Sequence, residues 1–170
     1  MVIEGAMKKN KVKEDPFLYA HEHKNEVVWM SQNTNHIPTT DEVEVAIKEA
    51  LESKEYNLYP YSKGLPELNS AIKSDLGIEE YDCLITHGAI EALYIITRAL
   101  LKEGDEVIAT DPSFMPIHHE VQLSNATPVE IGIYEKPWKL TPDDINEHIT
   151  KRTKMILLID PHNPMGSEYS

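Results

Sequence analysis

The chain has little cysteine, little positive charge and no long apolar run. Its one cysteine, Cys83, cannot form an internal disulfide, which favours a reducing, cytoplasmic location. Lysine and arginine total 16 against 29 acidic residues, which gives a formal net charge of -13. We therefore expect no nucleic-acid partner, because phosphate contacts need clustered basic side chains. We also expect no membrane association, since no apolar run approaches the roughly 20 residues that a spanning helix needs.

The 170 residues, 41% of them hydrophobic, can form a folded core and do not have the composition of a disordered chain. Residues 1–24 show no sustained period, so we expect a loosely packed arm there. Helical spacing of apolar residues predicts helices at 41–51 and 66–76. Pro66 suits the first position of the second helix, and Gly77 suits its end.

Strands and helices alternate from residue 83 onward. Apolar runs predict strands at 83–86, 106–110, 127–131 and 154–159, and helical spacing predicts helices at 89–101, 116–123 and 142–150. Such alternation gives right-handed crossovers and a mainly parallel sheet, which is an α/β fold. The helix at 89–101 is apolar on most sides, so we expect it to be buried. We expect the last strand to leave apolar residues exposed at a sheet edge, with Leu157 as the position to test.

The strand-to-helix junction Thr86-His87-Gly88-Ala89-Ile90-Glu91 is the first candidate site. Free N–H groups and the positive end of the helix dipole make such a junction favourable for an anion. Gly88 would let a phosphate approach the backbone closely. Taken alone, however, this pattern more often marks a turn glycine that binds nothing.

Two further side chains follow predicted strands. The segment Asp111-Pro112-Ser113-Phe114 places an aromatic ring after the second strand, although a lone Phe114 is more often a core residue. Asn163 brings an amide donor in a proline-rich loop after the last strand. Parallel strands end at one common edge of the sheet, which is where open α/β sheets bind ligands. A phosphate cradle, a flat aromatic and an amide donor at this edge together describe a site for a planar phosphorylated cofactor.

Several segments, in this order, resemble the motifs of class I and II aminotransferases, which are pyridoxal-phosphate enzymes of fold type I. They are Tyr59 with Gly64-Leu65-Pro66-Glu67-Leu68, then 86–93, 104–107, 111–114, 151–154 and Asn163-Pro164-Met165-Gly166. The resemblance runs from about Trp29 to the C-terminus. It implies a three-layer α/β/α fold with a mainly parallel sheet. Residues 1–40 would form an N-terminal arm and small-domain segment, and residues 41–170 the N-terminal half of the cofactor-binding large domain.

The resemblance also implies roles for individual residues. Backbone N–H groups of Gly88, Ala89 and Ile90 would hold the phosphate of pyridoxal 5'-phosphate. Phe114 would stack on the pyridine ring, and Asn163 would bond the 3-hydroxyl oxygen. We expect these residues to form the cofactor site.

Tyr59 matches a tyrosine that, in this family, reaches the phosphate bound by the neighbouring subunit. The resemblance therefore implies a homodimer with shared sites. Three positions depart from the family pattern. Ala89 replaces a frequent Ser or Thr, Asn69 stands where Arg is common, and Met165 replaces a frequent Thr. The lost hydroxyl at Ala89 leads us to expect weaker phosphate binding.

The family's catalytic groups are not found in this chain. Transamination needs a lysine that forms the internal Schiff base and a carboxylate partner for the pyridinium nitrogen. In the family both lie beyond the Asn-Pro-x-Gly motif, as does the arginine that binds the substrate carboxylate. We expect the N-terminal part of an enzyme that transfers an amino group between an amino acid and a 2-oxo acid. We expect no catalytic residue in these 170 residues and no activity from them alone.

Other interpretations stay open. The chain is also compatible with a non-catalytic binding or interaction module that retains a partial cofactor cradle. The segment Pro161-His162-Asn163-Pro164 is similar to a loop of the related carbon–sulfur lyases, while Ser31 to Asn35 resembles a segment of histidinol-phosphate aminotransferases. The amino donor is therefore undecided between aspartate, aromatic, histidinol-phosphate and sulfur-containing compounds.

Two histidine groups contain residue types that bind metals, His21-Glu22-His23 and His118-His119-Glu120. Adjacent side chains on a helix point about 100° apart, and no third ligand converges on either group by sequence. We therefore expect surface or loop histidines and no metal.

Overall fold

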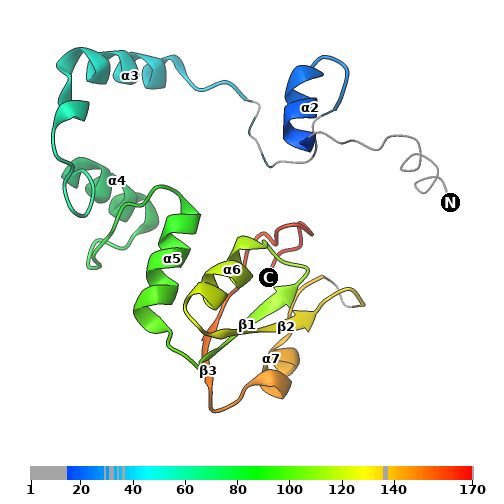
Figure 1. Ribbon diagram of the computed structural model, residues 1–170. Helices are drawn as coiled ribbons and strands as arrows, with labels where there is room; N and C mark the ends of the chain where they lie inside the picture. The colour runs from blue at the N-terminus through cyan, green and yellow to red at the C-terminus, as the bar shows by residue number, and fades with distance from the viewer. Residues whose placement is uncertain are drawn as a thin grey trace. The chain divides into compact units, whose positions relative to one another are not determined.

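The computed structural model of the chain describes residues 15–28, 30, 33, 35, 37–135 and 138–169 (Figure 1). They belong to two compact units, Met1–Tyr59 and Pro60–Ser170. Our expected boundary between an arm at 1–40 and a larger domain at 41–170 stays a prediction.

The first unit contains the helices α2, Pro16–Glu22, and α3, Asp41–Ser53, and the 3-10 helix η1, Glu55–Asn57. Helix α2 lies within the stretch where we expected a loosely packed arm. It begins because the Asp15 side chain accepts a hydrogen bond from the Phe17 N–H at 2.8 Å and proline occupies the first turn. This capping signal spans only two residues, so a search for apolar periodicity does not find it.

Helix α3 was predicted from its spacing and its start. Thr40 occupies the N-cap, acidic side chains fill the first turn, and Lys54 ends the helix with a φ of +58°. The structure describes every residue of this helix, and none is buried. Its predicted apolar stripe is therefore exposed within the first unit.

The second unit is built around a parallel sheet of three described strands in the order β2-β1-β3. They are β1, Glu106–Asp111, β2, Thr127–Gly132, and β3, Thr153–Ile156. In the register of the sheet, Ile108 pairs with Val129 on one side and with Ile156 on the other. The central strand β1 is the most buried element, because it has a neighbour on each side and helices on both faces.

Helices α6, Pro116–Leu123, and α7, Pro142–His148, cover the two faces of this sheet. Two further helices precede the first strand, α4, Pro66–Leu76, and α5, Ala89–Leu100, and α5 packs against α6. Neighbouring residues of β1 point to opposite faces, so Val107 and Ile108 belong to different cores. One core contains Val121 of α6, and Ile145 of α7 packs against the other, which matches the opposite positions of the two helices in Figure 1. The predicted three-layer α/β/α fold is confirmed.

The predicted strand at 83–86 is not a strand. Its backbone has one hydrogen bond to another segment, from Ile85 N–H to the Lys63 carbonyl at 3.1 Å, and no described residue pairs with it in a ladder. An apolar run becomes a strand only where a neighbouring strand takes up its backbone groups.

The expected burial of the helix at 89–101 was also wrong. The structure describes all of α5, and Thr97 is its single buried residue. The helix packs against α6, which covers one side, while Ile90, Tyr94 and Leu100 remain 43–56% exposed. The sequence thus indicated an apolar surface without identifying what covers it.

The last strand is shorter than predicted, since β3 ends at Ile156, although the Leu157 N–H still donates to the Ile108 carbonyl at 2.9 Å. Exposed apolar side chains are present as expected, but they are Ile156 and Leu158, at 40% and 52%. Leu157 instead packs against the core formed by Leu101 and its neighbours. Our choice of Leu157 as the exposed test position was therefore wrong, because alternate residues of the strand point to opposite sides.

Candidate functional site

Loops that follow the three strands meet at the carboxyl edge of the sheet. Strand β1 ends at Asp111 and the loop after it contains Phe114. The loop after β2 contains Tyr134, and the segment after β3 contains His162 and Asn163. The Tyr134 hydroxyl donates to Asp111 Oδ1 at 3.3 Å, which joins the end of β1 to the loop after β2. Burial and the nearby Asp111 carboxylate raise the pKa of Tyr134, so its hydroxyl stays protonated and able to donate.

His162 joins the third loop to β1. Its Nε2 lies 2.8 Å from Oγ1 of Thr110, and both residues are buried, with 2% and 4% of their surfaces exposed. Burial lowers the pKa of His162, which keeps the imidazole neutral at neutral pH. This bond brings the strand end before Phe114 beside the loop that carries Asn163.

The same loop is closed by two short main-chain hydrogen bonds. His162 N–H donates to the Ser167 carbonyl at 2.7 Å, and Gly166 N–H donates to the His162 carbonyl at 2.6 Å. Asn163 and Met165 are half-buried within it, and Met165 packs against the core around Ile108. Asn163 therefore lies in a compact turn that begins at His162 and is closed by the hydrogen bonds of His162 with Gly166 and Ser167.

The chain after this turn is tied to the loop that follows β2. The contacts are Ser167 Oγ to the Trp138 carbonyl, Lys139 Nζ to the Glu168 carbonyl at 3.0 Å, and Leu140 N–H to the Tyr169 hydroxyl at 3.3 Å. Within the segment after β3, Tyr169 N–H donates to Asp160 Oδ1 at 3.0 Å. Tyr134 and Trp138 also meet edge to face, with ring centres 6.2 Å apart. Loops from all three strands are thus cross-linked along the carboxyl edge.

The first turn of α5 has the geometry of an anion site. Gly88 is its N-cap with φ +84° and ψ 174°, a conformation that side-chain-bearing residues rarely adopt. Among the described residues, the backbone N–H groups of Gly88, Ala89 and Ile90 have no acceptor. The Glu91 carboxylate accepts from the His87 backbone N–H and lies 3.0 Å from His87 Nδ1, and these contacts lower the pKa of Glu91. Three N–H donors at the start of α5 thus lack an acceptor among the described residues, while the Glu91 carboxylate takes up the N–H of the residue before the N-cap.

The last turn of α5 lies toward the amino edge of the sheet. The far ends of α5 and α6 are joined by a hydrogen bond from Arg98 Nη1 to the Leu123 carbonyl at 2.6 Å. Both helices then lead into strands at the amino edge, β1 and β2. A helix of 12 residues is about 18 Å long, so the first turn of α5 lies about that far from the end that leads into β1.

The remaining predicted residue, Tyr59, ends the first unit, and its side chain is fully exposed. Its role stays a prediction. Asn69, where we noted a departure from the family pattern, donates from Nδ2 to the Lys63 carbonyl at 3.0 Å. That position supports the turn before α4 in this chain.

Sequence reasoning missed His162, Thr110 and Tyr134 as parts of this edge. The available signals were weak, since each is a single polar residue at the end of an apolar run. Their pairing depends on contacts between segments 52 and 23 residues apart in the chain. Such contacts follow from strand register, which a periodicity pattern does not give.

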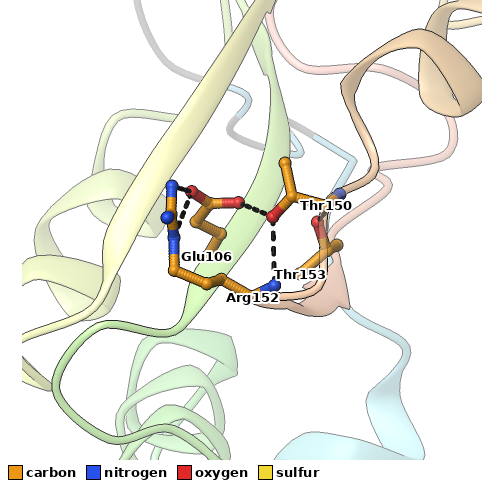
Figure 2. A network of polar contacts seen from close by, with 4 residues as sticks. All are labelled: Glu106, Thr150, Arg152 and Thr153. Atoms are coloured by element: carbon orange, nitrogen blue, oxygen red, sulfur yellow. Dashed lines mark hydrogen bonds and ion pairs between the residues drawn. The ribbon is translucent and has the colours of Figure 1, made fainter.

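A second polar network, at the amino edge, was also missed. Figure 2 shows Glu106 of β1 between the side chains of Thr150 and Arg152, which precede β3. The Thr150 hydroxyl and then the Arg152 guanidinium hold the pKa of Glu106 below its usual range. This network lies at the opposite end of the strands from Asn163, so it fixes β1 against β3 and is separate from the candidate site.

The histidine groups do not form a metal site within the described residues, where no cluster of three suitable ligands occurs. We expected His118 to be exposed, but its side chain is only 20% exposed. Its Nδ1 lies 2.8 Å from Glu130 Oε1 of β2. In the described parts of the chain, moreover, every helix is too short or too polar to cross a membrane.

Comparison with known proteins identifies relatives. The sequence profile of aminotransferase class I and II matches residues 25–170. An aspartate aminotransferase of Pyrococcus horikoshii is 34% identical over 136 residues, which are 76% of this chain and 34% of that protein. The structure of an alanine aminotransferase from Pyrococcus furiosus is similar with a TM-score of 0.70 at 34% identity, over 79% of this chain and 36% of that one. An aspartate aminotransferase from Rhizobium meliloti gives a TM-score of 0.76 at 27% identity, over 94% and 43% of the two chains. The chain thus spans about a third to two-fifths of the length of these relatives.

Proposed function

Because the chain belongs to the class I and II aminotransferase family and has its fold type I architecture, we propose that it forms part of a pyridoxal 5'-phosphate site. The enzyme transfers an amino group between an amino acid and a 2-oxo acid. Two observations support this proposal: the N–H groups of Gly88, Ala89 and Ile90 have no acceptor among the described residues, and the Thr110–His162 bond joins the strand end before Phe114 to the loop that carries Asn163.

The phosphate end of the cofactor fits the first turn of α5. The N–H groups of Gly88, Ala89 and Ile90 lack acceptors among the described residues, and the positive end of the helix dipole adds to the attraction for an anion. A side chain at residue 88 would strain the backbone that aims these donors. Ala89 contributes no hydroxyl, so the backbone supplies the contacts at this position.

The ring end fits the loops after β1 and β3. Phe114 offers a flat apolar face for stacking, and the Asn163 amide donates to the ring's 3-hydroxyl oxygen. When bound, pyridoxal phosphate supplies the electron sink that lets a proton leave the carbon bearing the amino group. This chain's residues bind and orient the ring, while the lysine that moves that proton belongs to a part of the enzyme outside these residues. The 170 residues alone are therefore inactive in transamination.

The substrates follow from the relatives in general terms. Two of the relatives are named for aspartate and one for alanine, so an amino acid and a 2-oxo acid are the substrate class. A homodimer with Tyr59 reaching the neighbouring subunit's phosphate is part of the same proposal, supported by the full exposure of Tyr59. The single cysteine supports a cytoplasmic location.

The test is cofactor binding to the complete protein encoded by the gene. Asn163→Ala should weaken binding by about 1.5–3 kcal/mol, because a hydrogen bond to a charged oxygen is lost. Phe114→Ala should weaken it by about 0.5–1.5 kcal/mol through lost stacking. The dissociation constant is measured by fluorescence titration with pyridoxal phosphate.

Two matched controls are available. Asn146 is exposed on α7, and Phe17, the second phenylalanine of the chain, is 47% exposed on α2. Replacing either with alanine should leave cofactor binding unchanged. Unchanged binding in both Asn163→Ala and Phe114→Ala would show that the site is placed wrongly, and absence of amino transfer by the complete protein with every amino donor would refute the activity.

A further inference from the structure

The loop that carries Asn163 is fixed by the residue before it. We propose that His162 is a positioning residue, which holds the Asn163 amide at its working position by tying the loop to Thr110 of β1. This inference rests on the proposed function, since it concerns how the chain aims a donor at the cofactor ring. It goes beyond that function because His162 itself need not touch the cofactor.

The contact joins the two halves of the ring site. Thr110 is in β1, four residues before Phe114, and His162 directly precedes Asn163. The 2.8 Å bond between their side chains therefore sets the distance between the aromatic loop and the amide loop. Consecutive Cα atoms lie about 3.8 Å apart, so a shift of His162 is passed to Asn163 almost undiminished.

The main chain makes the same residue the anchor of the turn. His162 donates through its N–H to Ser167 and accepts through its carbonyl from Gly166, at 2.7 and 2.6 Å. The turn between these residues is thus closed on His162 and moves with it. Because the side chain is bonded to the sheet and the backbone to the loop, His162 links the two.

The surroundings of the His162 ring leave its position dependent on the contact with Thr110. The ring is almost fully buried, and its Nδ1 has no partner among the described residues, so Nε2 makes the one polar contact that they give the ring. A hydroxyl both donates and accepts, so Thr110 can pair with either tautomer of a neutral imidazole. Removing the Thr110 hydroxyl should therefore release the ring from the strand without introducing a charge.

The test compares three threonine variants in the complete protein. Thr110→Val removes the hydroxyl at nearly constant volume. It should raise the pyridoxal-phosphate dissociation constant about three- to tenfold, which corresponds to the net contribution of one hydrogen bond. Thr110→Ser keeps the hydroxyl and should bind as the unmodified protein does. Thr97→Val is the control, because Thr97 is equally buried but its hydroxyl bonds the Tyr94 carbonyl within α5, at 3.1 Å. It should leave cofactor binding unchanged.

A merely structural role is separated from positioning by combining variants. If His162 acts through Asn163, Thr110→Val should have no further effect on the dissociation constant once Asn163 is alanine. An equal effect in both backgrounds would overturn the inference, as would normal binding by Thr110→Val alone. If the valine variant does not fold, Thr110→Ala removes the same hydroxyl without adding an atom. Normal binding by Asn163→Ala would instead overturn the site assigned under the proposed function, and this inference with it.

Discussion

Replacing Gly64 with alanine should destabilise the second unit far more than an ordinary glycine replacement. Gly64 has φ +93°, and a Cβ there would lie 2.3 Å from Cγ1 and 2.6 Å from Cβ of Ile85. Rotation of the Ile85 side chain can move Cγ1 away but leaves Cβ in place. The backbone must then shift, against the hydrogen bond from Ile85 N–H to the Lys63 carbonyl at 3.1 Å. The displaced segment leads directly into the first turn of α5, where the anion donors lie.

The magnitude combines two costs. A non-glycine residue in so sparsely populated a backbone region costs about 1–3 kcal/mol, and overpacking costs about 1–3 kcal/mol more. We therefore expect Gly64→Ala to lower the free energy of unfolding by about 2–6 kcal/mol, a large part of the roughly 5–15 kcal/mol of a typical domain. Gly77→Ala is the matched control, because Gly77 has φ +65° and open space around a Cβ, so only backbone strain of about 1–2 kcal/mol applies.

Urea unfolding of the purified chain measures the loss of unfolding free energy in Gly64→Ala and in Gly77→Ala. A double variant, Gly64→Ala with Ile85→Ala, removes Cγ1 but keeps Cβ at residue 85, so it should recover part of the overpacking cost and no backbone strain. The reasoning is refuted if Gly64→Ala costs no more than Gly77→Ala. Additive effects of the Gly64 and Ile85 replacements would equally show that the two residues are not in contact.

Two further predictions concern the sheet. Hydrogen bonds from Thr150 and then Arg152 hold the pKa of the Glu106 carboxyl below its usual 4.5. Its contribution to stability is therefore complete well above pH 4.5, and it is lost as the pH falls through that value toward the pKa of the folded state. The stability difference between the unmodified chain and Glu106→Gln should therefore be larger at pH 7 than at pH 4 in urea unfolding, and an equal difference at both would contradict the role of the charge. Just after the edge strand β3, Leu158→Lys should reduce self-association in sedimentation with little loss of stability, because Leu158 is 52% exposed. Leu157→Lys should cost about 1.5–3 kcal/mol, since Leu157 packs on the core, and equal stability of the two variants would contradict the assigned orientation.

Local chemistry in the sequence was enough to define most helices. The bounds of α6 were predicted as observed, because Pro116 suits the first turn and the apolar spacing ends at Leu123. Gly77, with φ +65°, ends α4, and the Thr141 side chain caps α7 by a reciprocal pair of bonds with Asp144. Each signal acts within about one turn of helix, so neighbouring residues decide it. The parallel sheet followed from the alternation of these helices with apolar runs.

The candidate site divides in the same way. The sequence placed Phe114 and Asn163 after two strands that the structure confirms, β1 and β3, and strand ends of a parallel sheet share an edge. The strand predicted before Gly88 is absent, and the cofactor role of all three residues stays a prediction. The bond between His162 and Thr110, and that between Arg152 and Glu106, were not found, because they join residues more than 40 positions apart in the chain. Which side chains meet across such distances depends on strand register.

The same physical reason explains two of the expectations that failed. The apolar run at 83–86 was as suitable for a strand as the run at 106–110, yet the second has partners on both sides and the first has none among the described residues. The residues of α5 are apolar on most sides, yet α6 covers only part of them. The sequence by itself determined most of the helical segments and which surfaces are apolar. Pairing and burial belong to relations between segments, so only the tertiary structure decided them.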